Sequence, residues 1–443
     1  MANSSPPPQA NLTGHATTTT SPLLAPLASL APLASLAPLA LLASPAAWLT
    51  VLAVYLVLCS SLRFRREKAV LRRFHYPDRA SLANMTLDDA QAILENIMTY
   101  EFPYMYKTSL QFAIFKTYGF ETMSRLIVAT RSFSDPETAP KRYEDTVVLF
   151  GQFQLNPPAS LPCIKAIARM NYLHDPYKRA GKIANADFLY TLAVCVTEPV
   201  RFVRQYEWRP LNDVEVNAIG CFWKALGDAM QIEYRGYLAR DSWRDGLEFV
   251  EDITAWAHGY EIEAMRPARS NAVPAYALAD MLLYHVPRVL KPFALEVLTV
   301  LMGDRVRDAF YYPEPSVFAS LAAYAALYLR RLALRYLALP RLRPVRYFSD
   351  PDPATGRVQH LDWLVEPHYL DGSLRNRWSA AAWAAWLFGG YVPGSGGQKF
   401  TPQGFLFEDI GPRAQRGKGK AEGEAWERIL RAQRTGGCPF ARR

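Results

Sequence analysis

An uncharged apolar stretch near the start of the chain restricts what the protein can be more than any other feature of its sequence. Residues 46–62 (AAWLTVLAVYLVLCSSL) carry no charged side chain, and Pro45 stands where a helix would begin. As a helix this stretch would be about 25 Å long, which is enough to cross a thin bilayer. The alternative is a helix buried in a core.

The flanking charges favour the membrane and predict an orientation. Six basic side chains lie within residues 63–73, against Glu67 alone, whereas residues 1–45 contain no Lys, Arg, Asp or Glu. Positive charge is retained on the cytosolic side of a membrane, so we expect the N-terminus in the lumen and the chain after Leu62 in the cytosol. A short span suits the thin endoplasmic reticulum membrane. We therefore predict a single-pass protein of that membrane.

Composition divides the chain into segments. Residues 1–45 are predicted to be a low-complexity luminal tether, because a proline recurs every six residues from 26 to 38 and prevents a continuous helix. After the anchor at 46–62 we expect a basic juxtamembrane linker at 63–79 and one domain at 80–412. Residues 413–443 are expected to be a charged, mobile tail with a helix near 424–432.

The charge and the cysteines exclude some classes of protein. The net charge of +9 is modest for 443 residues, and the sequence has no zinc-finger spacing, RNP motif or heptad-linked basic region. A membrane surface is therefore favoured over nucleic acid as the partner of the arginine-rich segments. The five cysteines are scattered and form no CxxC pair, which argues against a disulfide framework and fits a reducing compartment.

The domain is predicted to be mainly α. From about residue 78 apolar residues recur at helical spacing, and strand-like alternation is scarce. Thr86 is predicted to cap a helix that runs through residues 90–100, and Asn212 with Glu215 forms a capping box before another. Asn185 is also expected to be an N-cap.

A second apolar stretch, residues 317–339, contains Arg330, Arg331 and Arg335, which fall on one side of a helix. The pattern fits a helix that covers the core and equally one that lies in a membrane interface. We favour the helix that faces the core.

Common catalytic motifs are missing from the sequence. It has no GxGxxG, Walker A, HExxH or GxSxG motif, and no two of its seven histidines lie three or four residues apart. A metal held by one histidine points to a cofactor that brings its other ligands, as haem does. His174 is the candidate ligand, although a single histidine is more often structural. Asp175 and Pro176 are expected to bend or end its helix.

Several short segments together resemble one known catalytic domain. They are RYEDT at 142–146, the stretch from Arg169 to Asp187 that leads to Tyr190-Thr191-Leu192, Tyr260-Glu261 with Met265, Ser270-Asn271, Asn376-Arg377-Trp378, and residues 404–412. The domain that they resemble is shared by MpaB-type fungal endoplasmic-reticulum oxygenases and by rubber oxygenases, the latex clearing proteins. The similarity covers most of residues 80–412 and is closest to the fungal branch, which also has a membrane anchor.

The resemblance implies a fold, a cofactor and a reaction. In rubber oxygenases a helical, globin-like domain surrounds haem b, and dioxygen cleaves an isoprenoid carbon–carbon double bond. His174 would be the iron ligand, and Arg169 and Tyr177 in the same motif would contact the cofactor. Arg142 and Thr146 would be the distal pair, four residues apart on one helical face.

One departure from the rubber enzymes concerns the residue before the threonine. Those enzymes have a lysine there, and this chain has Asp145. Asp145 is predicted either to orient a proton or water as a catalytic residue or to be an exposed acid. As structural alternatives, Arg142 would pair with Asp145 or Glu144, and the hydroxyl of Thr146 would bond back to its own helix.

The leading prediction is a membrane-anchored, haem-dependent oxygenase of secondary metabolism. Its partners would be dioxygen and a lipophilic prenylated or terpenoid metabolite whose double bond it cleaves or oxidises, with no nucleic acid. One alternative is a related hydroxylase or dehydrogenase. The other is a non-catalytic, membrane-tethered lipid-binding protein.

Overall fold

The computed structural model describes residues 44–131, 133, 135–433 and 437–440. The chain divides into two units, one ending at Leu58 and the other beginning at Cys59. The predicted tether at 1–45 lies outside the described residues, apart from its last two positions.

The predicted anchor is helical. Helix α2 (Pro45–Arg63) covers all of residues 46–62, and most of its large apolar side chains are exposed. Two helical segments of the described chain are long and apolar enough to cross a membrane, Pro45–Phe74 and Val317–Leu337. The single membrane span at 46–62 therefore stays a prediction.

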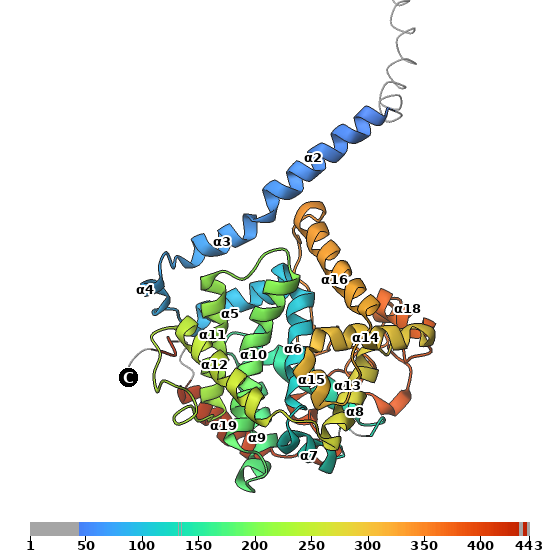
Figure 1. Ribbon diagram of the computed structural model, residues 1–443. Coiled ribbons are helices and arrows are strands. Elements are labelled where there is room, and N and C mark those ends of the chain that lie inside the picture. The colour runs from blue at the N-terminus through green and yellow to red at the C-terminus, as the bar shows by residue number, and fades with distance from the viewer. Residues whose placement is uncertain (1–43, 132, 134, 434–436, 441–443) are drawn as a thin grey trace, which may run out of the picture. The chain divides into compact units, whose positions relative to one another are not determined.

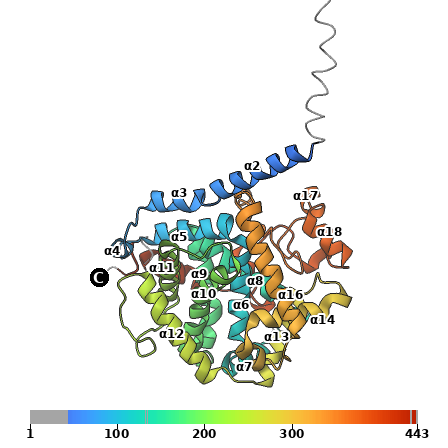
Figure 2. The same cartoon turned by 45° about the horizontal axis from the view of Figure 1, so that its top comes forward.

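The second unit is built from helices, as Figures 1 and 2 show. The α-helices after α2 are α3 (Arg65–Phe74), α4 (Arg79–Leu82), α5 (Leu87–Asn96), α6 (Pro103–Thr117), α7 (Glu121–Ala129), α8 (Ala139–Leu155), α9 (Leu161–Arg179), α10 (Asn185–Tyr206), α11 (Asp213–Ala229), α12 (Gly246–Ala264), α13 (Arg269–Leu282), α14 (Lys291–Met302), α15 (Asp304–Ala309), α16 (Val317–Leu332), α17 (Leu374–Arg377), α18 (Ala380–Leu387) and α19 (Lys420–Gln433). Single turns of π-helix, η1 (Ile97–Glu101) and η3 (Ala333–Leu337), and of 3₁₀-helix, η2 (Arg288–Leu290), η4 (Gly397–Lys399), η5 (Phe407–Asp409) and η6 (Arg413–Gln415), complete the set. Within the described residues β-structure is limited to two isolated antiparallel bridges, Phe348 with His360 and Val358 with Phe405. The mainly α prediction is confirmed.

The core lies where the central helices cross. Helix α10 packs along α6, α11 packs against α5 and α12, and α8 packs against α9. The largest fully buried side chains are aromatic, and Phe112 of α6 and Phe202 of α10 meet with ring centroids 5.1 Å apart. Burial of such rings stabilises the unit mainly through the hydrophobic effect.

Two of the three predicted helix caps are confirmed. The Thr86 hydroxyl accepts the Asp89 amide, and Asn212 and Glu215 form a reciprocal capping box. The helix after Thr86 ends as α5 at Asn96 and continues as the π turn η1. The prediction for Asn185 is wrong, because it is the first helical residue of α10 and its amide side chain bonds the backbone of Glu233.

The expectation that the helix of His174 could end at Pro176 is corrected. Helix α9 continues past Pro176 to Arg179, because a proline in the last turn removes only one hydrogen bond of the helix. The predicted linker at 63–79 is helical over α3, and Arg63 is buried with its guanidinium 4.1 Å from the centre of the Trp208 ring. The helix expected near 424–432 is present as α19, which packs on α9 and buries Leu430.

The favoured orientation of the second apolar stretch is wrong. Helix α16 fully buries only Ala319 and Ala323, and most of its large apolar side chains are exposed. The core is already filled by other helices, so α16 lies at the surface of the unit (Figure 2).

Two glycines set how closely α11 and α12 approach each other. A Cβ atom at Gly220 would lie 2.3 Å from the carbonyl oxygen of Gly246, and one at Gly246 would lie 2.3 Å from that of Asn217. Backbone atoms cannot move aside as a side chain can. The crossing therefore requires both residues to lack a side chain.

We predict that Gly220→Ala lowers the free energy of unfolding by about 1–3 kcal/mol, because the helices must move apart. The matched control is Gly259→Ala on α12, where a Cβ meets nothing within 4 Å and helix propensity favours alanine. Thermal denaturation of the full chain in detergent, followed by circular dichroism, measures both. Equal melting temperatures for the two variants would contradict the requirement for glycine where α11 and α12 cross.

Candidate active site

Helices α8 and α9 position the predicted site residues. Each begins with a proline in its first turn, Pro140 and Pro162, where the missing N–H costs no hydrogen bond. Their apolar residues face the core, among them Val148 and Phe153 of α8 and Ile167 of α9. This packing fixes which side chains of the two helices point into the space between them.

A cavity of about 390 Å³ opens beside these helices, within the range usual for cofactor and substrate sites. Its wall is mostly apolar and includes Ile114, Leu126, Phe133, Leu149, Phe150, Phe153, Met170, Leu173, Phe188, Leu192, Trp223 and Ile410. The polar and charged side chains in the wall include Arg142, Asp145, Thr146, His174, Tyr177, Lys182 and Asp187. Five of the six predicted site residues therefore line one cavity, and Arg169 does not.

Arg142 and Thr146 are joined to each other. The Arg142 guanidinium donates to the Thr146 hydroxyl, which in turn donates to the Arg142 carbonyl at 3.0 Å. The back-bonding proposed as the structural alternative for Thr146 is thus present. The ion pair proposed for Arg142 is not, since within the described part of the chain Glu144 and Asp145 have other partners. The guanidinium of Arg142 and the hydroxyl of Thr146 therefore both lie at the cavity wall.

His174 is a partly buried, neutral histidine at the cavity wall. Burial, and then the positive charge of Arg142, lower the pKa of its imidazole to about 4, while the Met170 carbonyl favours the protonated ring more weakly. The ring is therefore neutral at physiological pH. Neither of its nitrogens makes a hydrogen bond of ordinary geometry to any described residue, and Nδ1 is fully buried. Phe188 meets the ring edge-on at 5.5 Å between centroids.

Asp145 is buried, with 2% of its surface exposed, so the prediction of an exposed acid is wrong. Its carboxylate accepts hydrogen bonds from the Lys141 amine, the Tyr369 hydroxyl and the Gly411 amide, at 2.8, 2.5 and 3.0 Å. These bonds join α8 to two loops that are distant in sequence. Its role as a catalytic acid or base stays a prediction, and the contacts indicate that Asp145 positions the cavity wall.

Arg169 points away from the cavity, towards the C-terminal segment. Its guanidinium donates to the carbonyl oxygens of Ile410, Lys418, Glu408 and Gln415 at 2.9, 2.7, 3.1 and 2.8 Å. These four bonds use its Nε and both terminal nitrogens. The contacts give Arg169 the role of holding residues 408–418 on α9, and no contact supports its predicted role in cofactor binding.

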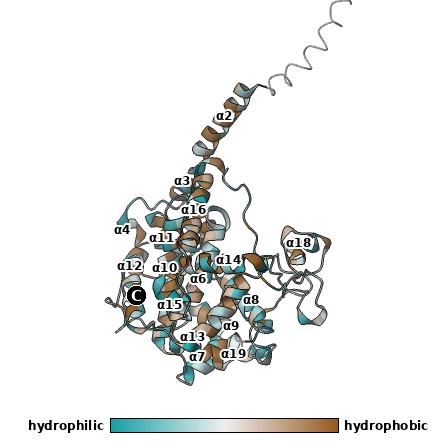
Figure 3. Ribbon diagram, turned by 45° about the vertical axis from the view of Figure 1, so that its right-hand side comes forward, coloured by the Kyte–Doolittle hydropathy of each residue, from teal (hydrophilic) through white to brown (hydrophobic). Residues whose placement is uncertain are grey.

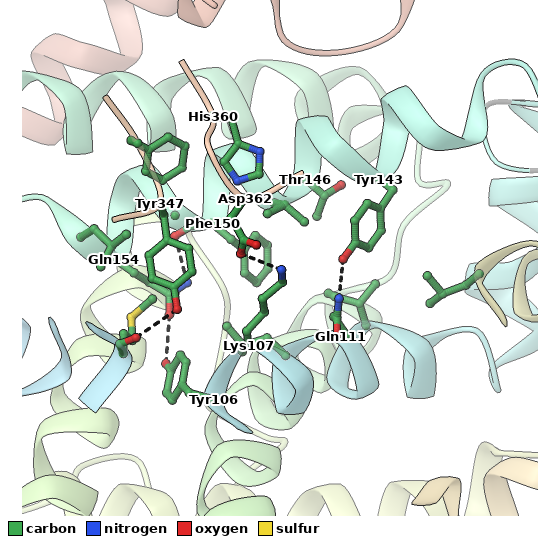
Figure 4. A pocket seen from close by; sticks show the side chains of 18 of the residues that line it. Tyr106, Lys107, Gln111, Tyr143, Thr146, Phe150, Gln154, Tyr347, His360 and Asp362 are labelled. Carbon is green, nitrogen blue, oxygen red and sulfur yellow. Dashed lines mark hydrogen bonds and ion pairs between the residues drawn. The ribbon is translucent and has the colours of Figure 1, made fainter. Parts of the chain in front are cut away.

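A second, smaller cavity of about 100 Å³ shares a wall with the first (Figure 4). Thr146 and Phe150 of α8 line both cavities, and Ile114, Tyr118 and Phe133 do so as well. Most of the remaining wall is apolar, and the Lys107–Asp362 ion pair, at 2.6 Å, also contributes to it. Together the two cavities can hold an extended lipophilic molecule.

Sequence reasoning missed one pair of residues at the smaller cavity. His360 lines it, and its Nδ1 atom bonds the carboxylate of Glu144 while both side chains are buried. Its Nε2 atom is buried without a partner among the residues that the structure describes. The two residues are 216 positions apart, so no local pattern in the sequence joins them.

Comparison with known proteins identifies the family of the chain. No family model matches the chain. The ER-bound oxygenase mpaB' of Penicillium brevicompactum is 39% identical over 405 residues, which cover 90% of this chain and 96% of that protein. The ER-bound oxygenase mpaB of the same fungus is 36% identical over 376 residues, 83% of this chain and 89% of that protein. The chain belongs to the family of these mpaB-type ER-bound oxygenases.

The family membership that the sequence motifs predicted is therefore confirmed, and the chain is an oxidoreductase of the oxygenase class. The mpaB oxygenase of Penicillium roqueforti is similar too, at 41% identity over 265 residues that cover 60% of this chain and 89% of that protein. The non-catalytic lipid-binding alternative is set aside.

Several residues that carry the family resemblance have structural partners. Glu261 accepts the Tyr190 hydroxyl at 2.8 Å and pairs with Lys116 at 2.7 Å, and Lys116 also pairs with the buried Glu198 at 2.9 Å. Asn271 is fully buried and its amide donates to the backbone of Gly119. These residues of the oxygenase join α6, α10, α12 and α13 to one another.

We predict that Arg169→Lys releases the C-terminal segment, because an ammonium cannot reach four carbonyl groups in a fixed planar array. We expect the lost charge-assisted hydrogen bonds to be worth more than about 1.4 kcal/mol. Tryptic cleavage at residues 413–418 would then be faster by about tenfold or more. Arg179→Lys, at the exposed end of the same helix, is the matched control. Equal cleavage rates in the two variants, read by mass spectrometry, would rule out the holding role.

Proposed function

We propose that this oxygenase binds haem b through His174 and cleaves a carbon–carbon double bond of a lipophilic prenylated or terpenoid metabolite. The observation that carries the proposal is a partly buried, neutral imidazole that faces the same cavity as the Arg142–Thr146 pair. The globin-like arrangement of the helices around that cofactor is part of the proposal.

The residues of the cavity fit haem. A neutral histidine is a common axial ligand, and a lone one suits an iron whose other ligands belong to a porphyrin. Among the described residues no group of three His, Cys, Asp or Glu side chains stands close enough to hold a metal by itself. The apolar wall suits the porphyrin, the exposed Lys182 suits a propionate, and Tyr177 also contributes to the wall.

Bound there, haem iron would supply the binding and activation of dioxygen. The protein's own contribution is electrostatic. The Arg142 guanidinium, held by Thr146, places a positive charge and hydrogen-bond donors at the cavity wall, where they stabilise negative charge that develops on oxygen. The apolar lining excludes water, which strengthens that interaction.

The smaller cavity suits the substrate's hydrocarbon chain. It shares Thr146 and Phe150 with the larger cavity, so a chain seated in it extends towards the space that His174 and Arg142 face. The buried Nε2 of His360 lies at its wall and can donate or accept one hydrogen bond. This buried nitrogen would orient one oxygen-bearing group of an otherwise apolar substrate.

Membrane attachment completes the proposal. The relatives are named ER-bound, and helix α2 is apolar and followed by basic residues. We propose one span at residues 46–62, a luminal N-terminus and a cytosolic catalytic unit in the endoplasmic reticulum membrane. A lipophilic substrate would then be concentrated in the same bilayer.

The reaction is tested by the masses of its products. Cleavage of a double bond by dioxygen gives two carbonyl fragments with one oxygen atom from O₂ on each, so ¹⁸O₂ would add one heavy oxygen to both. Hydroxylation would add one oxygen to an intact carbon skeleton, and dehydrogenation would remove two hydrogens. Either of these results with prenylated aromatic compounds would replace cleavage by the alternative oxidoreductase reaction.

We predict that His174→Ala in the full chain loses most of the Soret absorbance per protein, because the iron loses its protein ligand. His258→Ala, at an exposed position of α12, is the matched control and should keep the spectrum of the parent chain. Absorption spectra of the purified proteins after haem reconstitution measure the effect. A full Soret band in His174→Ala would refute the ligand assignment.

We predict that Leu110→Phe, which partly fills the smaller cavity, lowers kcat/KM for a prenylated substrate by about tenfold while the haem spectrum is kept. The control is Leu161→Phe at the exposed start of α9. Steady-state kinetics measure both variants. An unchanged kcat/KM in Leu110→Phe would show that the substrate chain lies elsewhere.

A further inference from the structure

Helix α16 exposes its apolar side. The outward side chains form one stripe along the helix and the following π turn, and Val317, Leu321 and Tyr328 are 84%, 68% and 60% exposed. The stripe consists of Val317, Phe318, Leu321, Tyr324, Tyr328, Leu329, Leu332, Tyr336 and Leu337. A surface helix of a water-soluble protein normally points such residues inward.

Two arginines of this segment, Arg330 of α16 and Arg335 of η3, contact the protein instead. Arg330 pairs with the buried Glu207 at 2.7 Å and donates to the Tyr206 carbonyl at 3.2 Å. The guanidinium of Arg335 lies 4.4 Å from the centre of the Phe64 ring. Since these contacts fix the rotation of the helix, the exposed stripe cannot turn inward without breaking a buried ion pair, a costly change.

The exposed surface extends beyond α16. Phe318 meets Phe293 of α14 at 5.8 Å between ring centroids, and Val289 and Leu290 of η2, just before α14, are 89% and 55% exposed. We call the α16 stripe together with Val289, Leu290 and Phe293 the apolar face. Figure 3 colours these elements by hydropathy. Contiguous apolar surface of this kind marks a site of interaction.

The charges around the apolar face select its partner. Residues 315–349 contain six arginines and no acidic residue, while Glu296 and Glu314 lie at the N-terminal end of the stripe. Arg331 and the exposed Arg343, towards the C-terminal end of the stripe, form no ion pair with any described residue. Basic side chains beside an apolar surface bind anionic phospholipid headgroups, and tyrosines are favoured at the depth of those headgroups.

We propose that the apolar face of α16 lies in the headgroup region of the bilayer and forms a second membrane contact beside the N-terminal anchor. The proposal rests on the membrane attachment given under the proposed function. Helix α16 lies along the membrane surface and does not cross it, because its Arg330 side is bound to the protein. The apolar segment at 46–62 leads directly into the catalytic unit, which keeps that unit close to the bilayer.

The experiment uses the full chain in phosphatidylcholine–phosphatidylserine vesicles, with a bimane fluorophore on a single introduced cysteine. Leu321→Cys reports on the apolar face, and Arg235→Cys, 89% exposed in the loop between α11 and α12, is the matched control. Four native cysteines are buried, and Cys438 is replaced by serine in every variant. Nitroxide-labelled lipids and aqueous iodide serve as the two quenchers.

A membrane contact predicts several-fold stronger quenching by nitroxide lipids at position 321 than at position 235, and weaker quenching by iodide. Equal accessibility to iodide at both positions would overturn the proposal. Protection at 321 from both quenchers would also overturn it, and would indicate a protein partner or a second copy of the chain.

Leu52→Cys in the anchor separates this proposal from the proposed membrane span. Strong lipid quenching at position 52 with none at 321 would leave the anchor in place and refute only the second contact. No lipid quenching at position 52 would refute the span itself. Because residues 52 and 321 are exposed, these substitutions are not expected to unfold the protein.

Discussion

The cavity depends on how two charged side chains hold one irregular segment. Arg169 donates four hydrogen bonds to carbonyl groups of residues 408–418, and Asp145 accepts the Gly411 amide from the same segment. Ile410, Gly411, Pro412 and Gln415 of that segment form part of the cavity wall. Buried backbone groups outside helices need such partners, and here one guanidinium and one carboxylate supply them. Without these bonds α8 and α9 would border a groove open to water.

The pentapeptide RYEDT shows how one helix serves several purposes. Successive side chains of a helix point in different directions, so its five residues reach different partners. Arg142 and Thr146 face the larger cavity, Tyr143 accepts a hydrogen bond from Gln111, Glu144 binds His360, and Asp145 binds Lys141, Tyr369 and Gly411. Arg142 and Thr146 are the two of these residues whose side chains bond, among the described residues, only within the pair, and which face the larger cavity. The motif therefore combines the chemistry of the site with the contacts that hold its walls.

The side chains of helix α16 are likewise divided between those that contact the protein and those that face its surroundings. Helix α16 uses Arg330 for a contact with Glu207 and leaves most of its large apolar side chains exposed, an arrangement that is unfavourable in water. An oxygenase whose cavities are lined by apolar groups and whose surface has an apolar face is suited to substrates that partition into lipid. The apolar cavities and the apolar face are both consistent with an enzyme that works at a lipid bilayer.

The sequence by itself determined the features that depend on local patterns and on motifs. Helical periodicity and the caps at Thr86 and Asn212 predicted a mainly α fold, and the motifs predicted the oxygenase family. Five of the six site residues that the motifs indicated line the larger cavity. Local sequence could not determine the rotation of α16, because its pattern fits both orientations and only the Arg330–Glu207 pair decides between them. Only the tertiary structure turned Arg169 towards residues 408–418, brought His360 to Glu144 and buried Asp145. Those contacts join residues more than 200 positions apart, and the free energy of each depends on burial that no local pattern encodes.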